Sequence, residues 1–223
     1  MKICNVTKNY GNFKLNVNKF ETKTGEIHGL IGSNGCGKTT AMKIMAGLIK
    51  PDSGTIDYEG LSPRDITMIT RKPYMLRDTV VNNLIYPLKL RNIKPDRAMI
   101  DHHLDIAGLQ DCRSLNALGL SSGQQQRLAL VRSMIFSPKL ILVDEAFSNM
   151  DVESLAFFEG YILDNFQHKQ ITWLIISHQL SIIKRMCSYV YFMHEGTVRY
   201  EGLTVDLLDN PQDDVLKKYL RYN

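Results

Sequence analysis

A glycine-rich segment near the N-terminus has the residue types that bind phosphate. Gly32-Ser33-Asn34-Gly35-Cys36-Gly37-Lys38-Thr39 fits the pattern G-x-x-x-x-G-K-[ST]. Small and φ-permissive residues let the backbone curl so that its N–H groups face an anion, and a helix that begins at this loop adds the positive end of its dipole. In such a loop Lys38 reaches the β- and γ-phosphates, and the hydroxyl of Thr39 binds Mg²⁺. The pattern predicts a nucleotide-binding loop, which by itself does not separate transport ATPases from kinases, GTPases or helicases.

Two carboxylates follow a run of apolar residues much later in the chain. Leu140–Val143 is typical of a buried strand, and it leads directly into Asp144 and Glu145. Ligands of parallel sheets bind at the carboxyl ends of the strands. We therefore expect Asp144 to coordinate Mg²⁺ through water, and Glu145 to polarise an attacking water. Taken without the glycine-rich loop, the same pair could be two surface carboxylates.

A second candidate phosphate site lies between these two segments. It reads Leu120-Ser121-Ser122-Gly123-Gln124-Gln125-Gln126-Arg127. The Ser121 hydroxyl, the Gly123 N–H and the start of a helix are all suited to a γ-phosphate. The segment is far along the chain from Lys38, so we do not expect one chain to bring both to the same phosphate. It closely resembles LSGGQQQR, the signature of the ATP-binding cassette (ABC) ATPases.

The resemblance to ABC ATPases extends over nearly the whole chain and implies a function. Members of this family dimerise head to tail, so that each signature segment covers the ATP of the partner. It implies ATP and Mg²⁺ as cofactors, and ATP hydrolysis coupled to transport through a separate integral membrane subunit. It also implies a cytoplasmic protein, peripheral on the cytoplasmic face of the membrane, in a homodimer or in a heterodimer with another ABC ATPase.

The resemblance assigns roles to individual residues. Catalysis is expected of Lys38, Glu145 and His178, the last as the switch histidine that contacts the γ-phosphate, and Thr39 and Asp144 are expected to hold the metal. Tyr10 occupies the place of the ring that stacks on adenine, although it could also be an ordinary tyrosine at a strand end. The expected nucleotide contacts are Tyr10, Gly32, Ser33, Asn34, Gly35, Cys36, Gly37, Lys38, Thr39, Thr40, Ser121, Ser122, Gly123 and Gln124. Ser148-Asn149-Met150-Asp151 occupies the place of the family's D-loop.

The sequence departs from the family pattern at three positions. Arg71 stands where the family has a glutamine whose oxygen ligates Mg²⁺. Arginine has no acceptor atom and cannot ligate a cation, but it can touch phosphate directly. We hypothesise that holding of Mg²⁺, or the link to the membrane subunit, is altered. Ser122 replaces a signature glycine, which would cause strain if its backbone required positive φ, and Ala146 replaces a proline after Glu145.

The pattern of elements predicts an α/β fold of the P-loop NTPase type. Strands are expected at 2–6, 13–17, 26–31, 55–58, 66–70, 140–143, 172–176, 188–193 and 197–200, with a turn at 51–54. Helices are expected at 38–46, 79–90 after Asp78 as cap, 97–107, 122–133 and 152–167, and short helices at the end. We expect a mostly parallel central sheet, an N-terminal antiparallel β subdomain and a helical insert. Residues 1–71 and 138–223 would form the RecA-like core with the β subdomain, and residues 72–137 the insert.

Within the insert, Tyr74–Asn83 is where the family docks its membrane subunit, but its apolar face could equally belong to the core of the insert.

Composition limits the remaining function classes. The 223 residues carry a net charge of +4, from 27 basic and 23 acidic side chains, and no basic run, so no nucleic-acid partner is expected. No apolar run approaches the ~20 residues of a membrane span. The four cysteines are scattered and are expected to be free thiols.

Three alternatives to a transporter subunit remain. One is a soluble ABC ATPase of DNA repair or translation, although the long coiled coil or second cassette of those proteins is absent. Another is a P-loop kinase or GTPase, which would lack the signature. The third is a degenerate ABC ATPase that acts as an ATP-dependent interaction module without hydrolysis.

Overall fold

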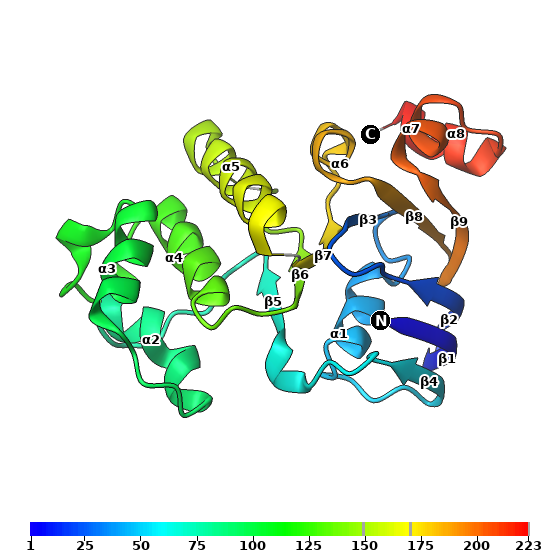
Figure 1. Cartoon of the computed structure of the whole chain (residues 1–223). Coiled ribbons are helices and arrows are strands. Elements are labelled where there is room, and N and C mark those ends of the chain that lie inside the picture. The colour runs from blue at the N-terminus through cyan, green and yellow to red at the C-terminus, as the bar shows by residue number, and fades with distance from the viewer. Residues whose placement is uncertain (149, 170, 223) are drawn as a thin grey trace.

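The protein is built on two β-sheets, described in a computed structural model over residues 1–148, 150–169 and 171–222 (Figure 1). The side chains of residues 165–169 are outside this description, as is Asn149 of the expected D-loop. The smaller sheet has three antiparallel strands in the order β2-β1-β4. These are β1 (Lys2–Tyr10), β2 (Phe13–Glu21) and β4 (Ser53–Asp57).

The larger sheet has six strands in the order β5-β6-β7-β3-β8-β9, all parallel except that β9 runs antiparallel to β8. They are β3 (Ile27–Ile31), β5 (Ile66–Thr70), β6 (Leu140–Asp144), β7 (Thr172–Ile176), β8 (Tyr189–His194) and β9 (Thr197–Leu203). The α/β class, the antiparallel N-terminal sheet and the mostly parallel central sheet are as expected from the sequence.

Helices surround the larger sheet and extend the molecule on one side. They are α1 (Lys38–Met45), α2 (Val80–Leu90), α3 (Arg97–Ile106), α4 (Ser122–Met134), α5 (Val152–Lys169), α6 (Leu180–Met186), α7 (Thr204–Asp209) and α8 (Asp214–Arg221). Single 3₁₀ turns lie at Pro63–Asp65, Gln110–Cys112 and Ala117–Gly119. The chain between β5 and β6 forms α2, α3 and α4, which lie together away from the small sheet (Figure 1). Among the described helices, none combines the length and the apolar character that crossing a bilayer requires.

The two faces of the larger sheet belong to different hydrophobic cores. Ile141 and Val143 of β6 pack in the core that includes α2 to α5, whereas Leu140 and Leu142 pack in the core shared with α1 and the small sheet. All four side chains are fully buried. A strand that is apolar at every position is what burial of both faces requires, because successive side chains point to opposite sides.

Two local predictions were wrong in detail. Thr79, not Asp78, caps α2, because its hydroxyl accepts a hydrogen bond from the Asn82 N–H (3.2 Å). Asp78 instead accepts from the Thr79 N–H (2.7 Å). The turn expected at 51–54 ends at Asp52, because Ser53 already pairs with Thr7 of β1 and begins β4.

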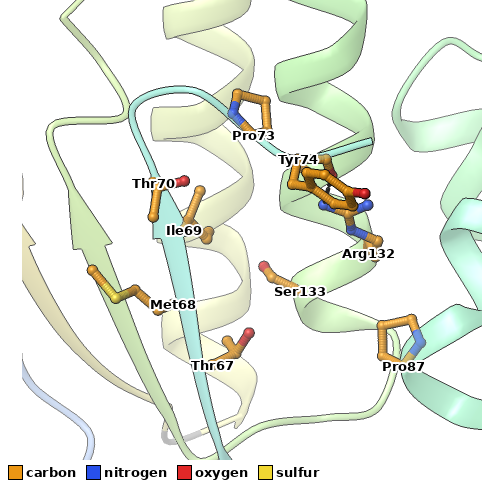
Figure 2. Close-up of a pocket in the computed structure, with 10 residues that line it drawn as sticks. Thr67, Met68, Ile69, Thr70, Pro73, Tyr74, Pro87, Arg132 and Ser133 are labelled. Carbon is orange, nitrogen blue, oxygen red and sulfur yellow. Dashed lines mark hydrogen bonds between the residues drawn. The ribbon is translucent and has the colours of Figure 1, made fainter. Parts of the chain in front are cut away.

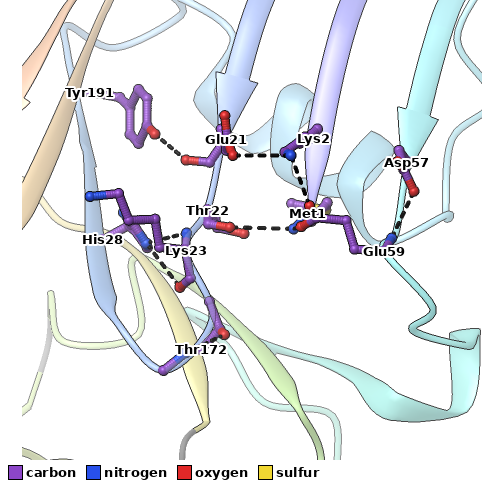
Figure 3. A network of polar contacts seen from close by, with 11 residues as sticks. Met1, Lys2, Glu21, Thr22, Lys23, His28, Asp57, Glu59, Thr172 and Tyr191 are labelled. Atoms are coloured by element: carbon purple, nitrogen blue, oxygen red, sulfur yellow. Dashed lines mark hydrogen bonds and ion pairs between the residues drawn. The ribbon is translucent and has the colours of Figure 1, made fainter.

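Polar contacts join the small sheet to the larger one (Figure 3). The Tyr191 hydroxyl of β8 donates to the Glu21 carbonyl at the end of β2. Between the sheets, His28 is 1% exposed, and its Nε2 accepts from the Lys23 N–H (3.0 Å). Burial lowers the pKa of His28, an effect that the nearby backbone of Lys23 and the charge of Glu26 only partly oppose. The neutral imidazole is therefore part of the junction between the sheets.

We expect this buried histidine to make the protein less stable in mild acid. Its folded-state pKa lies below the unfolded value of about 6.5, so the unfolded chain binds more protons. The stabilisation by neutral His28 is complete above the unfolded-state pKa. It is lost as the pH falls through the folded-state pKa. Urea unfolding at about pH 7.5 and about pH 5.5 measures the loss, which should be smaller in His28→Phe. An equal loss in both proteins would contradict the assignment.

Candidate functional site

The glycine-rich loop connects β3 to α1, and three of its glycines have backbone angles that favour glycine. Gly32, Gly35 and Gly37 have φ values of 148°, 77° and 105°. A Cβ on Gly32 would lie 2.1 Å from the carbonyl oxygen of Met193. Gly37 is the N-cap of α1 and has no side chain to cap it, so the first amides of the helix lack a side-chain acceptor. This is the geometry that a helix N-terminus offers to an anion.

Lys38 holds the loop together from inside. Its side chain is buried, and its ammonium donates to the carbonyls of Gly32 (2.7 Å) and Ser33 (3.0 Å). Burial lowers the pKa of Lys38, and the charges of Glu145 and Asp144 oppose that shift. The loop carbonyls therefore hold the ammonium, and the two carboxylates at the end of β6 are near enough to act on its pKa.

Asp144 ends β6 beside the start of α1. The Thr39 hydroxyl donates to Asp144 Oδ1 (3.0 Å), so the two oxygens expected to hold a metal are adjacent. Burial raises the pKa of Asp144, and the bond from Thr39 acts in the opposite direction. A buried carboxylate held by one hydroxyl favours a cation beside it.

Glu145 lies at the point where three strand ends meet. Its φ is 51°, an uncommon value for a residue with a side chain, and its N–H donates to the Ile176 carbonyl at the end of β7 (3.0 Å). One carboxylate oxygen contacts His178 Nε2 at 2.9 Å, and the other lies 3.9 Å from an Arg71 nitrogen. Sparsely populated backbone conformations of this kind occur at functional positions.

A cavity of about 210 Å³ collects many of the residues singled out in the sequence. It is lined by Phe13, Asn34, Gly35, Gly37, Lys38, Thr39, Thr40 and Glu145. Phe13 was not foreseen. The sequence signal that could have identified Phe13 is its position opposite Tyr10, with which it pairs at the β1–β2 hairpin. Tyr10 is half exposed and lies outside this lining. Gly32, Ser33 and the buried Cys36 are also outside it.

The signature segment forms the start of α4. Ser121 is its N-cap and exchanges hydrogen bonds with Gln124, whose N–H donates to the serine hydroxyl (3.3 Å) while its side-chain oxygen accepts from the Ser121 N–H (3.0 Å). Ser122 occupies the first helical position and is absent from the positive-φ residues, so the strain considered for a serine there does not arise. Residues 121–124 are not part of the lining of the cavity that holds Lys38.

Gly123 connects the signature to the beginning of α5. A Cβ at this position would lie 2.8 Å from the Ser154 hydroxyl and 2.9 Å from an Asp151 carboxylate oxygen. Asp151 in turn accepts from the Ser154 N–H (2.7 Å). A side chain at position 123 would have to displace these two polar groups, so the signature helix packs closely against the described end of the expected D-loop.

Comparison with known proteins decides the family. Residues 15–148 match the family model described as ABC transporter. The chain belongs to the ABC transporter family. It is an ATP-binding protein of that family, in which ATP hydrolysis is coupled to transport.

Two relatives and one solved structure illustrate the similarity. The tungstate uptake system ATP-binding protein TupC of Peptoclostridium acidaminophilum is 34% identical over 206 residues, which cover 88% of this chain and 95% of TupC. The methionine import ATP-binding protein MetN of Bacillus subtilis is 28% identical, over 89% of this chain and 63% of MetN. The structure of cbiO1 from Clostridium perfringens, part of the transporter complex cbiONQ, shares the fold with a TM-score of 0.78 at 22% identity and covers 94% of this chain and 90% of that one.

Two glycines of this ABC ATPase provide a matched test of the loop geometry. Alanine at Gly35 or at Gly37 is strained by about 1 kcal/mol because of the positive φ. At Gly37 the added Cβ also lies 2.8 Å from the Phe13 ring, whereas at Gly35 nothing lies within 4 Å. We therefore expect Gly37→Ala to reduce the free energy of unfolding by about 1–3 kcal/mol more than Gly35→Ala. Denaturant unfolding without nucleotide measures both, and equal losses would contradict the packing around Gly37.

Proposed function

We propose that two copies of this ABC ATPase, or one copy and a related subunit, close head to tail around two ATP molecules. One observation carries the proposal. The cavity beside Lys38 is lined by the glycine-rich loop and Glu145, but by none of the signature residues 121–124. A γ-phosphate held there needs the serine–glycine tip of α4 from another subunit to cover it.

The roles of the loop follow from its contacts. The amides at the start of α1 bind phosphate oxygens, and the Lys38 ammonium turns from the loop carbonyls toward the β- and γ-phosphates. Tyr10, half exposed at the β1–β2 hairpin, would stack on a base that extends beyond the cavity. The signature residues Ser121, Ser122, Gly123 and Gln124 act on the ATP of the partner.

Mg²⁺ fits the residues at the end of β6. Hydroxyl and carboxylate oxygens are the ligands that this ion prefers, and those of Thr39 and Asp144 lie 3.0 Å apart beside the phosphate loop. The bound ion would neutralise charge that develops on the phosphates.

Glu145 and His178 are placed to act on the water that attacks the γ-phosphate. Glu145 lines the cavity, and its carboxylate is held by His178 Nε2 at 2.9 Å. A carboxylate fixed in this way orients a water, while His178 and Lys38 stabilise charge on the transferred phosphoryl group.

We place the membrane subunit at a second pocket of the protein. A pocket of about 180 Å³ lies between β5, α2 and α4, and its labelled residues surround an opening beside Tyr74 (Figure 2). Arg132 of α4 donates to the Tyr74 carbonyl (2.7 Å) and to the Asn83 side chain (3.4 Å), which fixes the segment Tyr74–Asn83. Met75 and Val80 are core residues, whereas Tyr74 is 77% exposed. The segment thus belongs to the core of the insert through some side chains and presents others outward.

Docking of a membrane subunit at this pocket would divide the chain into two parts with different roles. Residues 72–137 would form the insert that carries the docking site, and residues 1–71 with 138–223 the core that carries the nucleotide. Closing of the dimer would move the insert and, with it, a membrane subunit, which keeps the ATPase at the cytoplasmic face of the membrane. The uptake and import functions in the names of TupC and MetN support transport into the cell.

Glu145→Gln tests hydrolysis and dimerisation together. The amide cannot accept a proton from water, so we expect ATPase activity to fall by about a hundredfold or more. Mg-ATP should then accumulate a dimer in size-exclusion chromatography with light scattering, whereas Lys38→Ala should remain a monomer. If the parent and Glu145→Gln are equally inert, the chain is an interaction module. If Glu145→Gln with ATP stays monomeric, alone and with its natural partner subunits, the shared-site proposal is wrong.

Tyr74→Ala tests the docking site. A large exposed aromatic at the centre of an interface contributes strongly to affinity, so we expect binding to the membrane subunit that co-purifies with the protein to weaken about tenfold or more. ATP affinity should be unchanged. Tyr222→Ala is the matched control, because Tyr222 is 73% exposed but caps the end of α8. Equal effects of both substitutions would contradict the assigned surface.

A further inference from the structure

Arg71 is fixed next to Glu145 by the pairing of two strands. β5 and β6 are parallel, and their last paired residues are Thr70 and Asp144. The residues that follow, Arg71 and Glu145, therefore leave adjacent strand ends at the same level. Their side chains meet, with 3.9 Å between an Arg71 nitrogen and Glu145 Oε2.

The turn after β5 keeps Arg71 at this position while leaving its side chain room to move. The Thr70 hydroxyl donates to the Lys72 carbonyl (3.1 Å) and closes the turn around Arg71. The Arg71 side chain is 57% exposed, whereas that of Glu145 is 20% exposed. The guanidinium is thus the more exposed partner of a pair whose carboxylate lines the cavity, and rotation about its long side chain changes which anion it meets.

The position of Arg71 matters because the cavity beside Glu145 would hold two negatively charged groups once ATP is bound. ATP brings a γ-phosphate toward Glu145, and two like charges a few ångströms apart repel each other. A guanidinium between them offsets that repulsion, and its planar donors match two phosphate oxygens at once. ADP has no γ-phosphate and gains nothing from such a group.

We propose that Arg71, paired with Glu145 at the ends of β5 and β6, is a built-in cation of the nucleotide site that binds the γ-phosphate, so that the protein selects ATP over ADP even without Mg²⁺. This inference rests on the proposed function, because it requires the γ-phosphate to lie beside Glu145. The inference goes beyond the proposed function because Arg71 gives the site a permanent positive charge. A glutamine at this position would have offered only an oxygen to a metal.

Nucleotide binding in excess EDTA tests the inference without using activity. The affinities of fluorescent ATP and ADP analogues are measured for the parent, Arg71→Gln, Arg71→Lys and Lys72→Gln, in EDTA and again in Mg²⁺. Lys72→Gln is the matched control, because it removes the same charge from the neighbouring exposed residue. Thermal unfolding of each variant checks that it is folded.

We expect Arg71→Gln to weaken ATP binding in EDTA about tenfold, equivalent to about 1.4 kcal/mol, and to change ADP binding less than about twofold. Arg71→Lys should retain part of the ATP affinity, because it keeps the charge but loses the two-pronged geometry. Lys72→Gln should behave as the parent.

Two results would overturn this inference and leave the proposed function intact. One is an Arg71→Gln protein that binds ATP in EDTA as tightly as the parent, while Lys38→Ala abolishes binding. The other is an equal loss for ATP and ADP, or for Arg71→Gln and Lys72→Gln, which would indicate general attraction of anions. If the parent binds neither nucleotide in EDTA or in Mg²⁺, the proposed function fails together with the inference.

Discussion

The parallel register of four central strands is the constraint on which the site depends. β5, β6, β7 and β3 run in one direction, so that their carboxyl ends meet at one edge of the sheet. At or just after these ends lie Arg71, Asp144 with Glu145, His178, and the glycine-rich loop that leads to Lys38. A slip of one residue in any of these pairings would move a charged group by one position and turn it to the other face. The burial of both sheet faces in separate cores opposes such a slip.

Much of this arrangement was readable from the sequence because it is local. The glycine-rich loop, the buried strand before Asp144 and the capped helix after Ser121 each follow from a short pattern with a mechanism. The α/β class and the inserted helices followed from the order of those patterns. The start of α2 was misplaced by one residue because Asp78 and Thr79 can both cap a helix, and the choice depends on the loop geometry that precedes it.

Other features were not readable, because they depend on which strands become neighbours. Nothing in the sequence pairs Arg71 with Glu145, since β5 and β6 are separated by the entire helical insert. Phe13 lines the cavity beside Lys38 because the β1–β2 hairpin lies against the glycine-rich loop. The close approach of Gly123 to Asp151 and Ser154 likewise required the packing of α4 against α5.

The contacts of the buried lysine have a consequence for how ligands are exchanged. An ammonium has three hydrogens, and that of Lys38 already directs two of them to the carbonyls of Gly32 and Ser33, with the Cys36 sulfur at 3.9 Å. A phosphate that recruits this group replaces bonds within the loop instead of adding to them. Under the proposed function, the loop bonds of Lys38 would open when phosphates bind and re-form as they leave. Those internal bonds would then hold the curvature of the loop between successive turnovers.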